Sequence, residues 1–300
     1  MAEAMTRVSV VIPHYSDLQS LATCLAALER QTTPPDEIVV ADNASPQGEA
    51  AVAQVIAGRA RLTTVPEKGA GPARNGGVAV ATGDILAFTD CDCVPEPGWL
   101  EAGLRALGAH DIVGGAMKVL VADEAGLTGA EAFERVFAFD NRDYVLRKGF
   151  TVTANLFCAR EVFERVGGFR VGVSEDLEWC QRARGAGYRL GYAPDAVVGH
   201  PARRTWAELR RKWLRLNEES FGLALAEPGG RLKWFVRALA MPASAVAHTP
   251  RALTSPRLSR ASDRAKALGT LFRLRVWRAV HAIALLARHT DRPDTESRRP

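Results

Sequence analysis

Two aspartates, Asp90 and Asp92, flank a single cysteine directly after the apolar segment Asp84–Thr89. In a strand, carboxylates one residue apart point to opposite faces, but in the turn that follows a strand they can converge. Mg²⁺ and Mn²⁺ prefer oxygen ligands and often bridge a carboxylate to substrate phosphates. The pair therefore predicts a divalent-cation site, although a D-x-D pattern alone is also common without a metal.

A glycine-rich segment, Glu67–Gly77, carries Arg74. Glycine lets the backbone approach a ligand closely, and an arginine can hold a phosphate through two parallel hydrogen bonds. The segment has neither the G-K-[ST] of a P-loop nor the G-x-G-x-x-G of a dinucleotide site. By itself it indicates either an ordinary glycine-rich loop or a phosphate contact.

Two further groups could take part in chemistry. Glu175 and Asp176 open a predicted helix, Glu175–Ala186, where acids interact favourably with the helix dipole. Their alternative role is that of a general base. His200 follows an apolar strand and is either a structural residue or a metal ligand.

The elements that must position these residues alternate between strand and helix over the first hundred residues. The predicted strands are Val8–Ile12 (ended by Pro13), Glu37–Ala41, Arg61–Val65 and Asp84–Thr89. The predicted helices are Leu18–Arg30, Glu49–Ala57 and Asn75–Ala81. This alternation predicts an α/β fold with a mostly parallel, Rossmann-like sheet flanked by helices. Ligands of such sheets bind beyond the carboxyl ends of the strands, where Asp42, Asp90 and Asp92 fall.

Charge divides the chain near residue 200. Residues 1–200 hold 18 basic and 26 acidic side chains, whereas 201–300 hold 21 basic and 8 acidic ones. We predict that the basic part is a helical C-terminal extension, with a linker at 249–262 and a longer helix at 264–288. We therefore predict a catalytic domain at 1–200, a basic helical region at 201–290 and a disordered tail at 291–300.

Composition and hydropathy exclude several classes of protein. At 47% hydrophobic and 24% charged residues, the chain has the composition of a globular protein. The N-terminus lacks the long apolar core of a signal peptide. No run of 18 apolar residues occurs, so we expect no membrane-spanning helix. Five thinly spread cysteines are typical of reduced thiols. Together these features predict a cytoplasmic protein.

Taken in order along the chain, these motifs resemble those of the family 2 glycosyltransferases, which have the GT-A fold. The resemblance spans about Val8 to His200. It is carried by Val10–Pro13 with Tyr15, Ile38–Ser45, Gly71–Gly77, Thr82–Asp84, Phe88–Asp92, Val166–Phe169, Glu175–Asp176 with Arg182 and Gly187, and His200.

The resemblance implies an inverting transfer of one sugar, of the hexosyltransferase type, from a nucleotide-diphosphate-sugar to an acceptor hydroxyl. It implies Asp176 as the general base and Mg²⁺ or Mn²⁺ held by Asp92 and His200. The nucleotide-sugar would be bound by Pro13, Tyr15, Asp42, Arg74 and Asp90. In this comparison Asp42 accepts a hydrogen bond from the base, Arg74 lies near the diphosphate, and Asp90 lies toward the ribose.

Several alternatives remain open at this point. A nucleotidyltransferase-like nucleotide-sugar enzyme would carry a glycine-rich basic signature after the first strand, where Pro13–Asp17 stands instead. A non-catalytic binding subunit is disfavoured by the presence of all three acids, Asp90, Asp92 and Asp176. The Q-x-x-R-W motif of processive synthases is absent, which favours addition of one sugar.

The acceptor and the partners are less defined by the sequence. A lipid-linked or polysaccharide (cell-envelope) glycan is the expected acceptor, and no nucleic-acid-binding motif occurs. Trp206, Leu209, Trp213 and Leu216, flanked by arginine and lysine, form a basic amphipathic stripe. Together with Phe272–Arg278 this stripe suggests peripheral contact with an anionic membrane at its inner face through 201–290. Alternatively, these aromatic residues pack as a cover over the catalytic domain.

Overall fold

The computed structural model describes residues 6–172 and 174–290, which divide into two compact units. The first contains the chain up to residue 118 together with 139–201. The second contains 119–138 and the chain after residue 201. We expected 1–200 to be continuous, but 119–138 joins the second unit because Phe133 and Val136 pack with the C-terminal helices. The predicted disordered tail lies outside the described residues.

Within the described residues, eight strands form one sheet in the order β3-β2-β1-β4-β7-β6-β8-β5. Their bounds are β1 Val8–His14, β2 Glu37–Asp42, β3 Arg61–Thr64, β4 Ile85–Phe88, β5 Val94–Pro95, β6 Ile112–Leu120, β7 Leu156–Ala159 and β8 Leu190–Pro201. The first four pair in parallel, whereas β7 pairs antiparallel with β4 and β6, and β5 pairs antiparallel with β8. The α/β prediction is confirmed, with a sheet that is more mixed than the sequence indicated.

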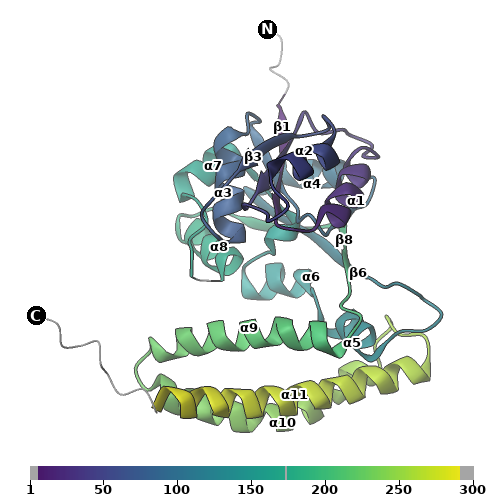
Figure 1. The fold of residues 1–300 in the computed structure, drawn as a ribbon, viewed down its shortest axis with the longest axis vertical. Helices are drawn as coiled ribbons and strands as arrows, with labels where there is room; N and C mark the ends of the chain where they lie inside the picture. Colours follow the sequence, from purple (N-terminus) through teal and green to yellow (C-terminus); the bar gives the residue numbers. More distant parts are fainter. Residues whose placement is uncertain (1–5, 173, 291–300) are drawn as a thin grey trace, which may run out of the picture. The chain divides into compact units, whose positions relative to one another are not determined.

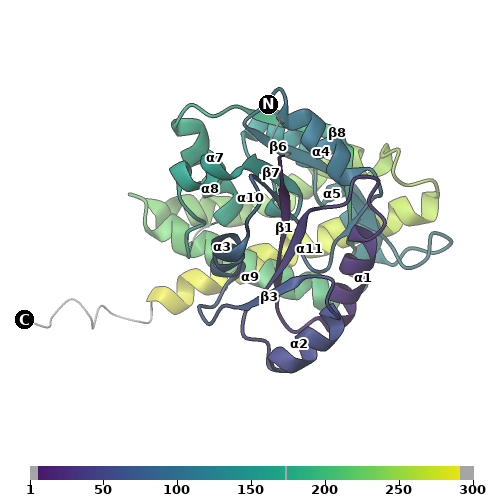
Figure 2. The same ribbon diagram turned by 90° about the horizontal axis from the view of Figure 1, so that it is seen from above.

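Helices cover both faces of this sheet (Figure 1). In the first unit they are α1 Leu18–Leu28, α2 Glu49–Ile56, α3 Ala70–Val80, α4 Trp99–Leu107, α6 Asn141–Asp143, α7 Arg160–Val166 and α8 Glu175–Gly185. A π-helical turn, Tyr144–Lys148, and a 3₁₀ turn, Thr153–Asn155, complete it. Figure 2 shows α1 and α4 on one side of β1, and α3, α7 and α8 on the other.

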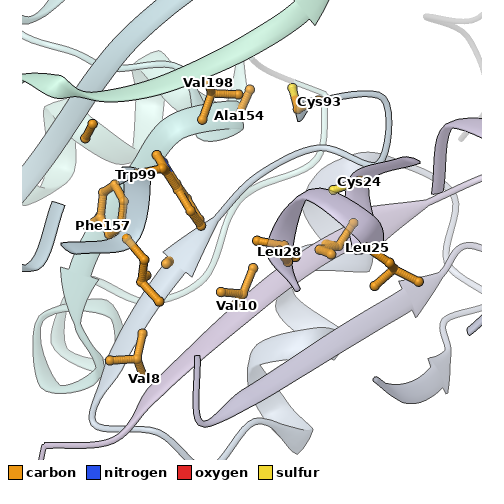
Figure 3. Close-up of a cluster of buried hydrophobic side chains, with 14 of the residues drawn as sticks. Val8, Val10, Cys24, Leu25, Leu28, Cys93, Trp99, Ala154, Phe157 and Val198 are labelled. Atoms are coloured by element: carbon orange, nitrogen blue, oxygen red, sulfur yellow. The ribbon is translucent and has the colours of Figure 1, made fainter. Parts of the chain in front are cut away.

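Alternation along β1 creates a separate hydrophobic core on each face of the sheet. Val10 and Ile12 point to the face that α1, α2 and α4 cover, where Trp99 is fully buried (Figure 3). Val11 points to the opposite face, where it joins Phe88 and Trp179. Because side chains alternate with a period of two, one apolar strand serves both cores. These cores hold the carboxyl ends of β1, β2 and β4 in place.

The structure extends β1 beyond the residue that we expected to end it. Pro13 lies inside the strand, which continues to His14 in register with Asp42 of β2. Proline is excluded from central strands because it cannot donate to a neighbour. Here the pairing with β4 ends at Val11, so Pro13 has β2 as its only strand neighbour among the described residues.

The glycine-rich segment is also more regular than predicted, because α3 begins at Ala70 and includes Arg74. A Cβ atom at Gly77 would lie 2.6 Å from a Val11 methyl group, and one at Gly71 would lie 2.8 Å from Glu175 Oε2. These glycines therefore allow close packing of a helix against β1 and α8. The predicted loop is confined to Glu67–Gly69, where Gly69 has a φ of +130° that favours glycine, whereas helix packing requires Gly71 and Gly77.

The second unit is helical. Its helices are α5 Gly129–Phe137, α9 Trp206–Leu225, α10 Gly230–Leu253 and α11 Ala261–Thr290. The aromatic stripe of α9 faces inward: Leu209 is fully buried, and Trp206 and Trp213 pack in the same cluster, with Trp277 of α11. The stripe that suggested a membrane contact is therefore part of this unit's own core.

The segment between α10 and α11 is shorter and better packed than the predicted linker at 249–262. Helix α10 continues through Pro242 and Pro250 to Leu253, and α11 begins at Ala261. Leu258, between them, is 1% exposed and packs with Leu127 and other apolar side chains. Burial of this leucine outweighs a composition that is typical of flexible linkers. None of the described helices is both long and apolar enough to cross a bilayer.

A buried carboxylate ties this unit together. Glu134 of α5 is 1% exposed and accepts hydrogen bonds from the Arg203 backbone (2.8 Å), the Arg203 guanidinium (3.0 Å) and Lys212 Nζ (3.0 Å). Burial by itself would raise the pKa of Glu134, but Lys212 and Arg203 outweigh it and lower the pKa from 4.5. A lowered carboxyl pKa stabilises the fold above the unfolded value and loses this effect as the pH falls.

We expect Glu134→Gln to lower the free energy of unfolding at pH 7 by about 1–2 kcal/mol, because charge-assisted hydrogen bonds are lost. As the pH falls from the unfolded value of 4.5 through the lower folded pKa of Glu134, this stabilisation is lost and the difference from the variant should shrink. Thermal unfolding followed from pH 7 to pH 3 measures both effects. Glu124→Gln, at an exposed acid of the same segment, is the control, and an unchanged difference at pH 3 contradicts the assignment.

Candidate active site

A buried hydrogen-bond network joins the carboxyl ends of β1 and β2. Asp42 Oδ1 contacts His14 Nδ1 at 2.8 Å and accepts from Ser45 Oγ at 2.5 Å, and Asp42 Oδ2 accepts from the Ser45 backbone at 2.9 Å. Burial would raise the pKa of Asp42, but the hydrogen bonds from Ser45 and His14 outweigh it and lower the pKa. Asp42 is therefore an internal anion that orients the His14 ring.

This network differs from the expectation that Asp42 would face a ligand directly. Asp42 is 1% exposed, and its oxygens are engaged by its own chain. The buried Nε2 of His14 has no hydrogen-bond partner among the described residues. Next to it, Tyr15 is 60% exposed beyond the strand end, whereas Pro13 is buried within β1.

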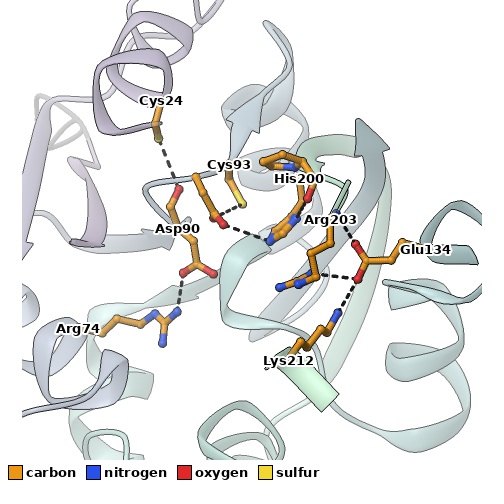
Figure 4. A network of polar contacts seen from close by, with 10 residues as sticks. Cys24, Arg74, Asp90, Cys93, Glu134, His200, Arg203 and Lys212 are labelled. Carbon is orange, nitrogen blue, oxygen red and sulfur yellow. Dashed lines mark hydrogen bonds and ion pairs between the residues drawn. The ribbon is translucent and has the colours of Figure 1, made fainter. Parts of the chain in front are cut away.

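Arg74 on α3 is held between two carboxylates. Its guanidinium pairs with Asp90, in the turn after β4, and with Glu175, at the start of α8 (Figure 4 shows the contact with Asp90). The Arg74 side chain is 3% exposed. Burial would lower its pKa, but Asp90 and Glu175 outweigh it and raise the pKa. These two ion pairs link α3, the turn after β4 and the start of α8 at the carboxyl edge of the sheet.

The turn after β4 supplies a group of potential cation ligands. One ligand atom each of Asp90, Asp92 and Cys93 lies within 4.8 Å of the others. The two carboxylates offer the oxygen ligands that Mg²⁺ and Mn²⁺ prefer, whereas a thiol suits softer metals. The donor set therefore fits a hard divalent cation held by the two aspartates.

His200, near the end of β8, reaches the same turn. Its Nε2 lies 3.4 Å from Asp92 Oδ2, and its Nδ1 donates to the Pro201 carbonyl at 2.8 Å. Because a carbonyl oxygen only accepts, Nδ1 carries the hydrogen of that bond. The other ring nitrogen, Nε2, then faces the Asp92 carboxylate, which places both groups within reach of one cation. The ring of Phe139 packs against His200 at a centroid distance of 4.4 Å.

Asp176 differs from its neighbour Glu175, which is paired with Arg74. Asp176 Oδ1 accepts from Ser174 Oγ (3.0 Å) and from the Leu177 backbone (2.8 Å). Burial raises the pKa of Asp176 above its usual value, and these hydrogen bonds together with Arg74 offset only part of the rise. A carboxylate with a raised pKa is better suited to accept a proton than an ordinary aspartate.

The structure thus brings most of the predicted site residues into one connected region. Asp92 contacts His200, and Arg74 links Asp90 to the start of α8, where Asp176 lies. Asp42 belongs to the separate network with His14 and Ser45. Sequence reasoning assigned no individual role to His14 or Ser45, and it considered Glu175 only as a helix-start acid or general base, not as a partner of Arg74. The D-x-x-S spacing of Asp42 and Ser45 was a usable signal, because a serine there commonly bonds back to the aspartate.

Comparison with known proteins shows the family of the chain. Residues 9–175, more than half of the chain, match the sequence profile of Glycosyl transferase family 2. The chain belongs to that family. The predicted family is therefore confirmed, and this glycosyltransferase is not the nucleotidyltransferase-like enzyme considered as an alternative.

Relatives of this glycosyltransferase are found among characterised and structurally solved proteins. Glycosyltransferase AglE of Haloferax volcanii is 32% identical over 228 residues, 73% of this chain and 74% of AglE. Pre-mycofactocin glycosyltransferase of Mycobacterium tuberculosis is 35% identical over 149 residues, 45% of this chain and 31% of that protein. The mannosyltransferase PcManGT from Pyrobaculum calidifontis, solved with GDP-Man and Mn²⁺, aligns with a TM-score of 0.58 at 22% identity over 96% of this chain and 88% of PcManGT. The predicted GT-A fold is confirmed.

Proposed function

We propose that this glycosyltransferase moves one sugar, with inversion, from a nucleotide-diphosphate-sugar to the hydroxyl of an acceptor. The observation that carries the proposal is the connected group Asp92–His200 and Asp90–Arg74–Glu175, with Asp176 adjacent. Solved relatives support the donor class: PcManGT holds GDP-Man and Mn²⁺, and GalNAc-T7, aligned with a TM-score of 0.53, holds UDP, GalNAc and Mn²⁺.

In the proposed reaction Asp176 is the general base. Its carboxylate takes the proton of the acceptor hydroxyl, whose oxygen forms a bond to the anomeric carbon of the donor sugar. The bond between that carbon and the diphosphate oxygen breaks, and its electron pair leaves with the nucleoside diphosphate. Because attack and departure occur on opposite sides, the anomeric configuration inverts. Only Asp176 is assigned this role, because Glu175 is already paired with Arg74.

Asp92 and His200 would hold Mg²⁺ or Mn²⁺, with Asp90 beside them. The cation supplies charge that stabilises the departing diphosphate. Arg74 orients Asp90 through their ion pair and places its positive charge next to that carboxylate. The network of Asp42 and His14, together with Pro13 and the exposed Tyr15, would bind the nucleotide base and ribose at the β1–β2 edge.

The metal assignment is tested by thermal unfolding with a panel of nucleotide sugars and Mn²⁺. A donor at 100 times its Kd adds about 2.7 kcal/mol to the free energy of unfolding, which gives a clear shift in Tm. We expect Asp92→Asn to abolish the part of this shift that depends on Mn²⁺. Glu96→Gln, a nearby partly exposed acid, should keep it. A full Mn²⁺-dependent shift in the Asp92→Asn protein would exclude Asp92 as a ligand.

We propose a lipid-linked or cell-envelope glycan as the acceptor. The support comes from the proposed transfer of one sugar and from the basic second unit. The test is transfer of radiolabelled sugar, from the donor that gives the largest Tm shift in that panel, to lipid-linked and to free glycan acceptors side by side. We expect transfer to the lipid-linked or cell-envelope acceptor, and transfer to neither would contradict the proposal.

A further inference from the structure

The outward side of α10 is apolar. Five of its apolar side chains are 43–67% exposed on this side: Leu232, Phe235, Val236, Leu239 and Val246. At 100° per residue this set lies opposite the buried set Trp234, Ala238, Met241 and Ala245. No lysine, arginine, aspartate or glutamate occurs from residue 238 to residue 250. The helix therefore presents an uninterrupted apolar stripe to solvent.

Helix α11 repeats this arrangement beside it. Its exposed apolar side chains are 38–62% exposed, and they are Phe272, Val276, Val280 and Ile283. They lie opposite the buried set Ala267, Leu271, Leu274 and Ala282. Figures 1 and 2 show α10 and α11 running side by side. Single exposed apolar residues are ordinary, but nine in two periodic stripes on adjacent helices indicate a binding surface.

The charge of these helices identifies the kind of partner. Residues 230–290 contain twelve lysines and arginines and only one acidic residue, Asp263. Such a surface attracts an anionic partner and repels a second copy of itself. An apolar stripe flanked by basic residues matches the boundary between acyl chains and anionic headgroups.

One arginine of α11, Arg278, is buried among the helices of the second unit. Arg278 is 5% exposed; its Nε donates to Asn217 Oδ1 at 3.0 Å, and its guanidinium lies 4.0 Å from the Trp213 ring centre. No ion pair joins it to a carboxylate of the described residues. Burial, with Arg275 and Arg237 nearby, lowers its pKa to about 9. Among the described residues, no carboxylate therefore neutralises the positive charge of Arg278.

We infer that the outward stripes of α10 and α11 dock this enzyme on an anionic membrane surface. The apolar side chains enter the interfacial layer, and the surrounding basic side chains meet lipid phosphates. This surface replaces the stripe on α9 that the sequence suggested, since Leu209 and its neighbours are buried. The inference concerns the second unit alone, so it stands or falls independently of the proposed sugar transfer.

Vesicle flotation of the full chain tests the inference. We expect the wild-type protein to float with phosphatidylglycerol vesicles at low salt and to remain at the bottom with phosphatidylcholine vesicles. Leu239→Gln/Val246→Gln/Val276→Gln/Val280→Gln should lower the floated fraction about tenfold or more, because each exposed apolar side chain lost weakens insertion. Leu146→Gln/Val171→Gln removes two equally exposed apolar side chains from the first unit and should float like the wild type.

Three results would overturn the inference. The first is a wild-type protein that does not float with phosphatidylglycerol vesicles, and the second is a quadruple variant that floats as well as the wild type. The third is a wild-type dimer in solution that the quadruple variant converts to a monomer, which assigns the stripes to a second copy. Far-ultraviolet circular dichroism confirms that the variants fold, as expected for substitutions of exposed side chains.

Discussion

Asp176→Asn is expected to lower the rate of sugar transfer roughly 10²–10⁴-fold, the range that a positioned general base contributes. The substitution keeps the size and shape of the side chain but removes its ability to accept a proton. Donor binding should be preserved, because Asp176 contacts Ser174 and Leu177 within its own helix start. Initial rates of nucleoside diphosphate release with saturating Mn²⁺, donor and acceptor measure the effect.

The raised pKa of Asp176 adds two readouts. In the wild type, the rate should fall on acidification at a pH above the ordinary aspartate value of 3.8, and the variant should lose this limb of the profile. A carboxyl pKa that folding raises destabilises the native state once the pH exceeds the unfolded value. The neutral amide removes this cost, so the Tm of the variant at pH 7 should equal or exceed that of the wild type.

The control for Asp176→Asn is Glu164→Gln, at an exposed acid of the same unit, which should leave rate, pH profile and Tm unchanged. A variant at position 176 that transfers sugar at the wild-type rate would show that another group takes the proton. A fall in rate with an unchanged acidic limb would assign Asp176 a binding role instead.

Arg74→Met is expected to cost about 3 kcal/mol of folding free energy, because it removes the cation between two carboxylates. We take the lower end of the range for a buried pair, because the Asp90 and Glu175 side chains are 28% and 25% exposed. Water therefore solvates part of the charge that the substitution leaves behind. Thermal and urea unfolding followed by circular dichroism measure the loss.

A double variant separates loss of the ion pair from loss of packing. Arg74→Met/Glu175→Gln removes one of the two stranded carboxylates, so it should recover about 1 kcal/mol or more relative to Arg74→Met. Arg165→Met breaks an exposed pair with Glu161 and should cost no more than about 0.5 kcal/mol. Equal stability of the single and double variants would mean that Arg74 stabilises the fold through packing rather than charge.

Local pattern was sufficient for much of the fold and for the choice of candidate residues. The apolar runs at Val8–Ile12 and Asp84–Thr89 predicted buried strands because burial on both faces requires continuous apolar sequence. Asp90 and Asp92 were recognisable because a strand end in an α/β sheet is where ligands bind. The boundaries were less predictable: β1 passes through Pro13 and α3 begins at Ala70, since both depend on neighbours that are distant in sequence.

The roles within the site depended on partners that the sequence does not place. Glu175 and Asp176 are adjacent acids of similar type, and only the approach of Arg74 from α3 shows that the first is paired. Asp42 was expected to face a ligand, but His14 and Ser45 engage it in the fold. Arg74 and His14 lie far in the chain from the carboxylates they engage, so only the fold shows these contacts, whereas the bond from Ser45 to Asp42 is local.

The sequence by itself established the family, the α/β class, the acids of the site and the basic character of the C-terminal part, because these rest on residue identity and spacing. Tertiary structure decided which surfaces are exposed. Trp206, Leu209 and Trp213 form an amphipathic stripe on α9 that is as clear as that of α10. The stripe of α9 packs in the core of the second unit, whereas that of α10 faces solvent. Helical periodicity shows that a helix has an apolar face, but only packing determines whether another helix covers it.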